Sequence, residues 1–132
     1  MNTILPTRTC FDDVLEHQVA LARRDPTAAA RQRIVHGICL LPEPDGNRSA
    51  GEPFAHAWVE DQETLEVWQS GLLADGRKVW FAIAAAEFLD KLRVQSSTRY
   101  SLDQARILNW QTGHYGPWVP GYRAFCRNQR VR

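Results

Sequence analysis

Cysteine is scarce in this 132-residue sequence, and its spacing excludes two common uses of the residue. The three cysteines, Cys10, Cys39 and Cys126, are odd in number and irregularly spaced, so they do not indicate a disulfide framework. Neither they nor the four histidines follow a ligand spacing such as CxxC or HxxxH. We therefore expect no metal site and no other cofactor. Each thiol must then serve in packing or as a reactive group.

Long apolar runs and an excess of one charge are also missing. No stretch approaches the roughly 20 apolar residues of a membrane span, and the first residues lack an apolar run of signal-peptide length. Lys and Arg number 16 against 15 Asp and Glu, so a net charge of +1 does not indicate a dedicated binder of nucleic acid or membranes. These absences predict a cytoplasmic protein with reduced thiols and no membrane partner.

What the sequence does have is the length and composition of one globular domain. Hydrophobic residues make up 44% of it, and we expect a single domain over 1–132. Apolar periodicity, capping signals and turn residues predict helices over about 10–24, 84–92 and 101–111, a short Ala-rich turn over 27–32, and strands over 33–41, 54–60, 64–69 and 78–83. A helix followed by antiparallel strands and further helices is typical of an α+β domain.

Cys10 is the first candidate for a reactive group. Thr9 to Asp12 matches the [ST]-x-x-[DE] signal of a helix start, which makes Cys10 the first helical residue. Free backbone N–H groups and the helix dipole favour negative charge at that position. We therefore expect a lowered pKa for this thiol, whose thiolate form is the nucleophile. The alternative is a half-buried cysteine that helps the helix to pack.

His56 is the second candidate, because it alternates with Phe54 and Trp58 along a predicted strand. An imidazole serves as a general base near neutral pH when its ring reaches the nucleophile. Without such a partner, a histidine in a strand is a surface or core residue. For His36, in the strand over 33–41, the packing role is favoured.

A cysteine that opens a helix, followed 46 positions later by His-Ala-Trp-Val-Glu (56–60), resembles the papain-like and transglutaminase-like superfamily of thiol enzymes. The string is similar to the histidine segment of bacterial transglutaminase-like proteins and of the leader peptidases of lasso-peptide pathways. It is also similar to small phage- and plasmid-borne bacterial proteins that combine it with a late segment, here Arg99 to Ser101, Ala105 and Gly113 to Trp118. The resemblance covers most of residues 9–118 and implies an N-terminal helix packed on a small antiparallel sheet.

The resemblance also implies roles for individual residues. Cys10 would be the nucleophile and His56 the base. The third member of the family's triad is an Asp or Asn about a dozen residues after the histidine, and neither stands there in this sequence. Gln69, or Glu66 as the charged option, would orient the imidazole instead. Walls of a substrate cleft would come from four aromatic or histidine side chains, Trp58, Trp68, His114 and Trp118.

Three hypotheses of function follow. The leading one is a thiol protease-like hydrolase or acyl transferase that acts on an amide, isopeptide or thioester bond of a peptide or protein. The alternative is a catalytically inactive papain-like module that binds or inhibits a protein partner, as small proteins of mobile elements do. The third is contact with nucleic acid through a basic C-terminal tail over 119–132, where a solvated tail is the alternative; its arginines are Arg123, Arg127, Arg130 and Arg132.

Overall fold

The first helix, α1, spans Cys10–Arg24 in the computed structural model, which describes residues 4–126 of the chain. The helix begins and ends where the sequence predicts. Acidic side chains in its first turn and arginines in its last turn complement the helix dipole. Its start is held differently from the prediction, because the Thr9 hydroxyl donates to the Asp13 carboxylate at 2.9 Å and makes no cap to the backbone.

The remaining helices and strands follow the predicted order with three additions, the strands β1 and β6 and the 3-10 helix η1. The other helices are α2 (Pro26–Ala30), α3 (Ala85–Leu92), α4 (Leu102–Thr112) and the 3-10 helix η1 (Pro120–Phe125). The strands are β1 (Leu5–Pro6), β2 (Gln32–Leu40), β3 (Pro53–Asp61), β4 (Glu66–Leu72), β5 (Lys78–Ala84) and β6 (Ser96–Tyr100). Strands β1 and β6 are absent from the prediction. Both are short and polar or proline-containing, so they lack the alternating apolar pattern that marks a strand.

Within residues 4–126 the six strands form one sheet, and every pair in it is antiparallel. The chain is therefore an α+β domain with an antiparallel sheet, as the sequence predicts. The strand order is β1-β4-β3-β2-β6, with β5 also paired to β4, so β3 is the middle strand and β2 lies between it and the edge strand β6. None of the helices in the described part of the chain is long and apolar enough to cross a bilayer.

The sheet divides along one edge of β4. The opposite edge of β4 pairs with β5 from Glu66 to Leu72. The dividing edge pairs with β3 only at Val67 and Trp68, and with β1 at Gly71 and Leu72. At Gln69 and Ser70 no strand of residues 4–126 pairs with this edge. We call this place, where β4 has parted from β3 and not yet met β1, the β3–β4 split.

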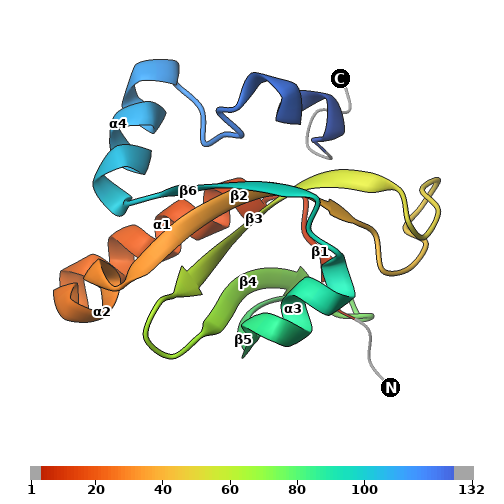
Figure 1. The fold of residues 1–132 in the computed structure, drawn as a ribbon, viewed down its shortest axis with the longest axis horizontal. Coiled ribbons are helices and arrows are strands. Elements are labelled where there is room, and N and C mark those ends of the chain that lie inside the picture. Colours follow the sequence, from red (N-terminus) through yellow and green to blue (C-terminus); the bar gives the residue numbers. More distant parts are fainter. Residues whose placement is uncertain (1–3, 127–132) are drawn as a thin grey trace.

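Helices lie on both sides of the sheet (Figure 1), and each face of the sheet carries its own buried core. The α1-side core joins α1, α4 and the C-terminal segment to the sheet through Cys10, Phe11, Val14, Leu15, Ile34, Ile38, Ala55, Ala57, Val59, Tyr100, Ala105 and Tyr122. The α3-side core packs α3 on the other face through Val35, Cys39, Leu41, Phe54, Trp58, Val67, Phe88 and Leu92. Burial of each large apolar side chain contributes about 1.5–3 kcal/mol, so the two cores together fix how the helices sit on the sheet.

The packed part of the domain continues past residue 119, where the sequence predicted a basic tail. A basic tail was expected from residue 119, but Val119 and Phe125 pack against the α1-side core and Tyr122 is buried in it. The backbone of Cys126 pairs with that of Ala55 of β3 in an isolated parallel β-bridge. The start of the predicted tail is therefore wrong, because the apolar residues among its arginines find a buried surface to cover.

Candidate functional site

His56 and Gln69 meet across the β3–β4 split. His56 Nε2 lies 2.9 Å from the side-chain oxygen Oε1 of Gln69, and both side chains are buried. An amide oxygen only accepts hydrogen bonds, so Nε2 carries the proton and donates it. This tautomer leaves the lone pair, which a general base needs, on Nδ1. The bond joins His56, which the resemblance implies as the base, to Gln69, one of the two residues that it offers as the orienting group.

Glu66, the charged option for the orienting group, does not reach His56. It lies at the start of β4, exposed, where its carboxylate accepts from the Thr64 hydroxyl at 3.2 Å. Side chains alternate along a strand, so Glu66 lies on the opposite face of β4 from Gln69. The proposal of Glu66 as the third residue is therefore wrong.

The imidazole of His56 is held by aromatic rings of the α3-side core. Phe54 and Trp58, two residues before and after it on β3, lie with ring centroids at 5.5 and 5.8 Å. Phe88 of α3 covers the ring at 6.3 Å. Trp58, expected as a cleft wall, is only 1% exposed and forms the interior support of the histidine. These contacts limit the imidazole to few orientations, which is what a positioned base requires.

Cys10 approaches the same stretch of β3 from the other side. Its thiol lies in the α1-side core together with Ala55 and Ala57, whereas the alternation of β3 puts the His56 side chain in the α3-side core. The backbone N–H of Ala57, the residue after His56, donates a hydrogen bond to the thiol. The structure thus brings Cys10 to the backbone beside His56, with the two side chains on opposite faces of the strand.

The predicted activation of Cys10 by the helix start is wrong in this conformation. The residue is only 3% exposed, and burial raises the pKa of its thiol to about 12, although the Ala57 N–H bond lowers it. The free-energy cost of burying a thiolate here is larger than the stabilisation that the helix N-terminus and the hydrogen bond give to it. The thiol is therefore protonated at neutral pH in this structure.

The start of α1 is anchored to the strands around the split. Lys78 at the start of β5 binds the Asp13 carboxylate at 2.9 Å and the Thr9 hydroxyl at 3.2 Å. The Thr7 and Ser70 hydroxyls lie 2.9 Å apart and are both buried, which ties the residue after β1 to β4. Sequence reasoning missed this contact, because only the pairing of β1 with β4 brings Thr7 and Ser70 together.

A cavity of about 470 Å³ opens on the α3 side of the split. Gln69 and Ser70 of β4 line it on the inside, and Phe88, which touches the imidazole of His56, lines it from α3. The rest of the lining is mostly apolar, with Pro6, Gly71, Phe81, Ile83 and Leu92 among its residues. This volume is within the range of small-ligand pockets, so the cavity is the candidate entrance for an apolar group.

The other predicted cleft residues lie elsewhere. Trp68 belongs to the opposite face of β4 from Gln69 and lines a separate cavity of about 250 Å³ with Trp80 and His17. His114 organises a turn, where its Nδ1 accepts from the Gly116 backbone N–H at 3.0 Å. Trp118 packs on His36, with centroids 4.8 Å apart. Trp68, His114 and Trp118 are therefore not walls of the cavity beside Gln69.

The late segment that carries part of the resemblance covers a buried histidine. Phe11, Tyr100 and Trp118 surround the ring of His36, which is 1% exposed, and Gly116 lies close against it. His36 Nδ1 has no hydrogen-bond partner within residues 4–126. This confirms the packing role favoured for His36 and gives the Gly113 to Trp118 string a role in closing the α1-side core.

Among residues 4–126, no group of three or more His, Cys, Asp and Glu side chains is arranged to hold a metal ion. Of the arginines predicted to contact nucleic acid, Arg123 is exposed on η1, and Arg127, Arg130 and Arg132 lie outside the described residues. Comparisons with known protein families, with curated proteins and with solved structures found no match for this chain.

Proposed function

We propose that the protein is a papain-like or transglutaminase-like thiol enzyme that transfers or hydrolyses an acyl group held in an amide, isopeptide or thioester bond. The observation that carries the proposal is the hydrogen bond between His56 and Gln69 across the β3–β4 split. A neutral amide that accepts a hydrogen bond from Nε2–H fixes the tautomer of the imidazole. An orienting residue acts on a catalytic histidine in this way.

In the proposed reaction, His56 Nδ1 takes the proton of the Cys10 thiol while the sulfur attacks the acyl carbon of the substrate. The same imidazolium then gives the proton to the leaving amine or thiol, and an acyl-enzyme thioester forms at Cys10. Water or a second nucleophile, deprotonated by His56, releases the acyl group. The backbone N–H of Cys10, at the first helical position, is the donor for the oxyanion.

For this reaction the Cys10 side chain must turn from the α1-side core into the split, where β4 does not pair with β3. The cavity that adjoins Gln69 and Phe88 would hold an apolar side chain or acyl group next to the imidazole. Substrate entry would also end the protonated resting state, because the developing imidazolium offsets the cost of forming a thiolate in a buried place.

A mass-spectrometric acylation assay tests the proposal. The protein is incubated with an N-acetyl-phenylalanine thioester at pH 7, and the acyl mass is located on Cys10, Cys39 or Cys126. We expect acylation at Cys10 in the wild type and a loss of at least about 100-fold in its rate in His56→Ala, since general-base catalysis contributes on that order. Cys39, which is also buried, serves as the internal control. Labelling of Cys10 no faster than Cys39 would reject the enzyme.

The burial of Cys10 favours a second candidate, a non-catalytic papain-like module that binds a protein. In that case the thiol only packs the start of α1, and Cys10→Ala changes stability but no partner affinity. The two candidates separate by iodoacetamide labelling at pH 6–7. An enzyme whose thiol visits the split reacts at Cys10, and this reaction depends on His56. A packing thiol reacts only when the whole chain unfolds.

A further inference from the structure

A second concave surface lies between α1 and α4, on the other side of the sheet from the cavity beside Gln69, and has no part in the proposed reaction. It encloses about 450 Å³. On the α1 side its residues recur every three or four positions, so they form one helix face. The lining consists of Leu15, Glu16, Val19, Ala20 and Arg23 from α1, Arg106, Asn109 and Trp110 from α4, and Tyr115 from the turn after α4. We call it the α1–α4 groove.

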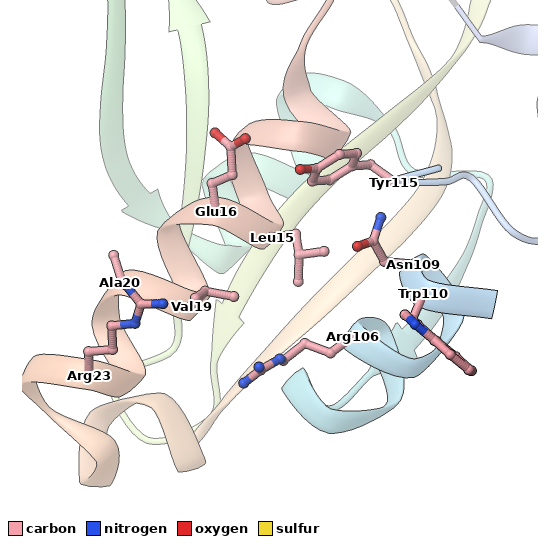
Figure 2. A pocket seen from close by; sticks show the side chains of 9 residues that line it. All are labelled: Leu15, Glu16, Val19, Ala20, Arg23, Arg106, Asn109, Trp110 and Tyr115. Carbon is pink, nitrogen blue, oxygen red and sulfur yellow. The ribbon is translucent and has the colours of Figure 1, made fainter. Parts of the chain in front are cut away.

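The floor of the groove is apolar and its shape is fixed. Leu15 and Val19 point from α1 toward α4, and the Tyr115 ring closes one end (Figure 2). Leu15 is buried in the α1-side core, which sets the depth of the floor. The Asn109 side chain donates to the His114 carbonyl at 3.1 Å, which holds the turn that presents Tyr115. A groove built on two packed helices keeps its shape without a ligand.

The positive charge of the groove is concentrated at the end away from Tyr115. Arg106 extends from α4 toward α1, and Arg23 lies in the last turn of α1 (Figure 2). Within residues 4–126 neither guanidinium has an ion-pair or hydrogen-bond partner. The acid of the lining, Glu16, lies two helical turns before Arg23. An anionic group therefore fits the arginine end and is disfavoured near Glu16.

The apolar surface continues beyond the groove along α4. Trp110 is 84% exposed and Ile107, one turn before it, is 56% exposed. In Figure 2 the Trp110 indole points away from α1 at the rim of the groove. Tryptophan and arginine are among the residue types that dominate binding energy at protein interfaces. A small molecule in the groove would leave this rim uncovered.

We propose that the α1–α4 groove is a docking site for a peptide segment of a partner protein in which an acidic side chain lies next to one or two large apolar side chains. The apolar side chains fill the floor over Leu15 and Val19 and cover Trp110. The acidic side chain binds Arg23 and Arg106, which supply the charge complementarity that selects this class of segment. The inference is independent of the reaction proposed for Cys10.

Selection from a random dodecapeptide library displayed on phage, with the full-length protein immobilised, tests this directly. We expect enriched peptides to carry Asp or Glu within a few positions of Leu, Phe or Trp. Synthetic copies should bind at least tenfold more weakly to Arg106→Glu and to Trp110→Ala, measured by fluorescence anisotropy. Affinity should also fall with added salt, since the arginines are exposed. The control is Arg24→Glu, which makes the same charge change as Arg106→Glu but at a residue that lines a different cavity, on another face of α1 from Arg23, and it should change affinity less than about twofold.

Three results would overturn the proposal. The first is an absence of enriched peptides. The second is enriched peptides whose affinity is the same for wild type, Arg106→Glu and Trp110→Ala, because they then bind elsewhere. The third is self-association of the free protein that Trp110→Ala abolishes, which would assign this face to a second copy of the chain. Circular dichroism of each variant confirms folding, and all three substituted side chains are exposed, so stability is expected to change little.

Discussion

The Nε2 atom of His56 and the Oε1 atom of Gln69 are 2.9 Å apart at the place where the backbones of β3 and β4 no longer pair. The bond therefore replaces ladder hydrogen bonds with one side-chain contact. Both partners are buried, so neither has water to compensate for a lost bond. The same bond is the structural basis of the proposed catalysis and a contribution to stability, and the two roles can be measured separately.

Gln69→Leu should destabilise the protein by about 1–3 kcal/mol, because it leaves the buried Nε2–H of His56 without its acceptor. The free energy of unfolding in urea, followed by circular dichroism, gives the measurement. Gln62→Leu, at an exposed position in the turn before β4, is the control and should stay within about 0.5 kcal/mol of the wild type. Equal effects of the two substitutions would show that the His56–Gln69 bond contributes nothing to stability.

The stability of the protein should fall as the pH is lowered from about 6.5 toward 3. Burial, together with a smaller contribution from the nearby His56, lowers the pKa of His36 from its ordinary value of 6.5 to about 3. Between these pH values the unfolded chain binds a proton at this residue that the folded chain does not. The free energy of unfolding therefore decreases with falling pH, by up to about 1.4 kcal/mol per pH unit for this group.

The pH effect of His36 is isolated by comparing the wild type with His36→Leu in urea at pH 7, 6 and 5. The variant removes the titrating group and keeps an apolar side chain among Phe11, Tyr100 and Trp118. Its stability should decrease less between pH 7 and 5 than that of the wild type. Parallel curves for the two proteins would mean that the folded chain protonates His36 as readily as the unfolded chain does.

Much of the fold was predictable because local signals agree with tertiary packing. The periodic apolar residues after Cys10 form α1 over the predicted range, and Ser101 with Gln104 forms the predicted capping box of α4. The strands β1 and β6 were not predicted, because they form only by pairing with β4 and β2. A strand of two residues, such as Leu5–Pro6, is too short to show an alternating apolar pattern.

The candidate site shows the same division. The resemblance implied Gln69 or Glu66 as the orienting residue, and His56 meets Gln69 because the turn between β3 and β4 returns the chain beside itself. The sequence left open whether Cys10 is reactive or helps the helix to pack, and in the structure it lies in the α1-side core together with Tyr122. A helix start lowers the pKa of a thiol only where water or a cation also reaches the sulfur. The spacing of residues in the sequence does not show whether the sulfur is reached.

Asp61→Asn should destabilise the protein by about 2–3 kcal/mol. Burial raises the pKa of the Asp61 carboxyl, but hydrogen bonds from the Thr64 N–H, Gln32, Arg31 and the Glu63 N–H outweigh it and hold the pKa well below its usual range. An asparagine keeps the oxygen that accepts from the turn N–H groups, but an amide NH₂ faces the Gln32 and Arg31 donors.

The Asp61 effect should depend on pH in a defined direction. A carboxyl whose folded pKa is lowered stabilises the protein above its unfolded pKa of about 3.9, and this stability is lost as the pH falls through the folded value. The difference between Asp61→Asn and wild type, measured in urea, should thus be constant from pH 7 to 5 and shrink below about pH 4. A difference that grows in acid would contradict the assignment of the network to an ionised Asp61.

Gly116→Ala should cost more stability than Gly46→Ala, although both glycines have positive φ angles. The φ of Gly116 is +109° and that of Gly46 is +61°, so each alanine is strained by its backbone conformation. At Gly46 a Cβ meets nothing within 4 Å, and we expect a loss of about 1 kcal/mol.

At Gly116 a Cβ would collide with the His36 ring, lying 3.0 Å from Nδ1, and the ring is held by Phe11, Tyr100 and Trp118. Overpacking of this kind adds about 1–3 kcal/mol, to be measured as the difference in unfolding free energy between the two variants in urea. Equal losses would mean that the turn moves away from His36 freely, and that the Gly113 to Trp118 string covers this face without fixing it.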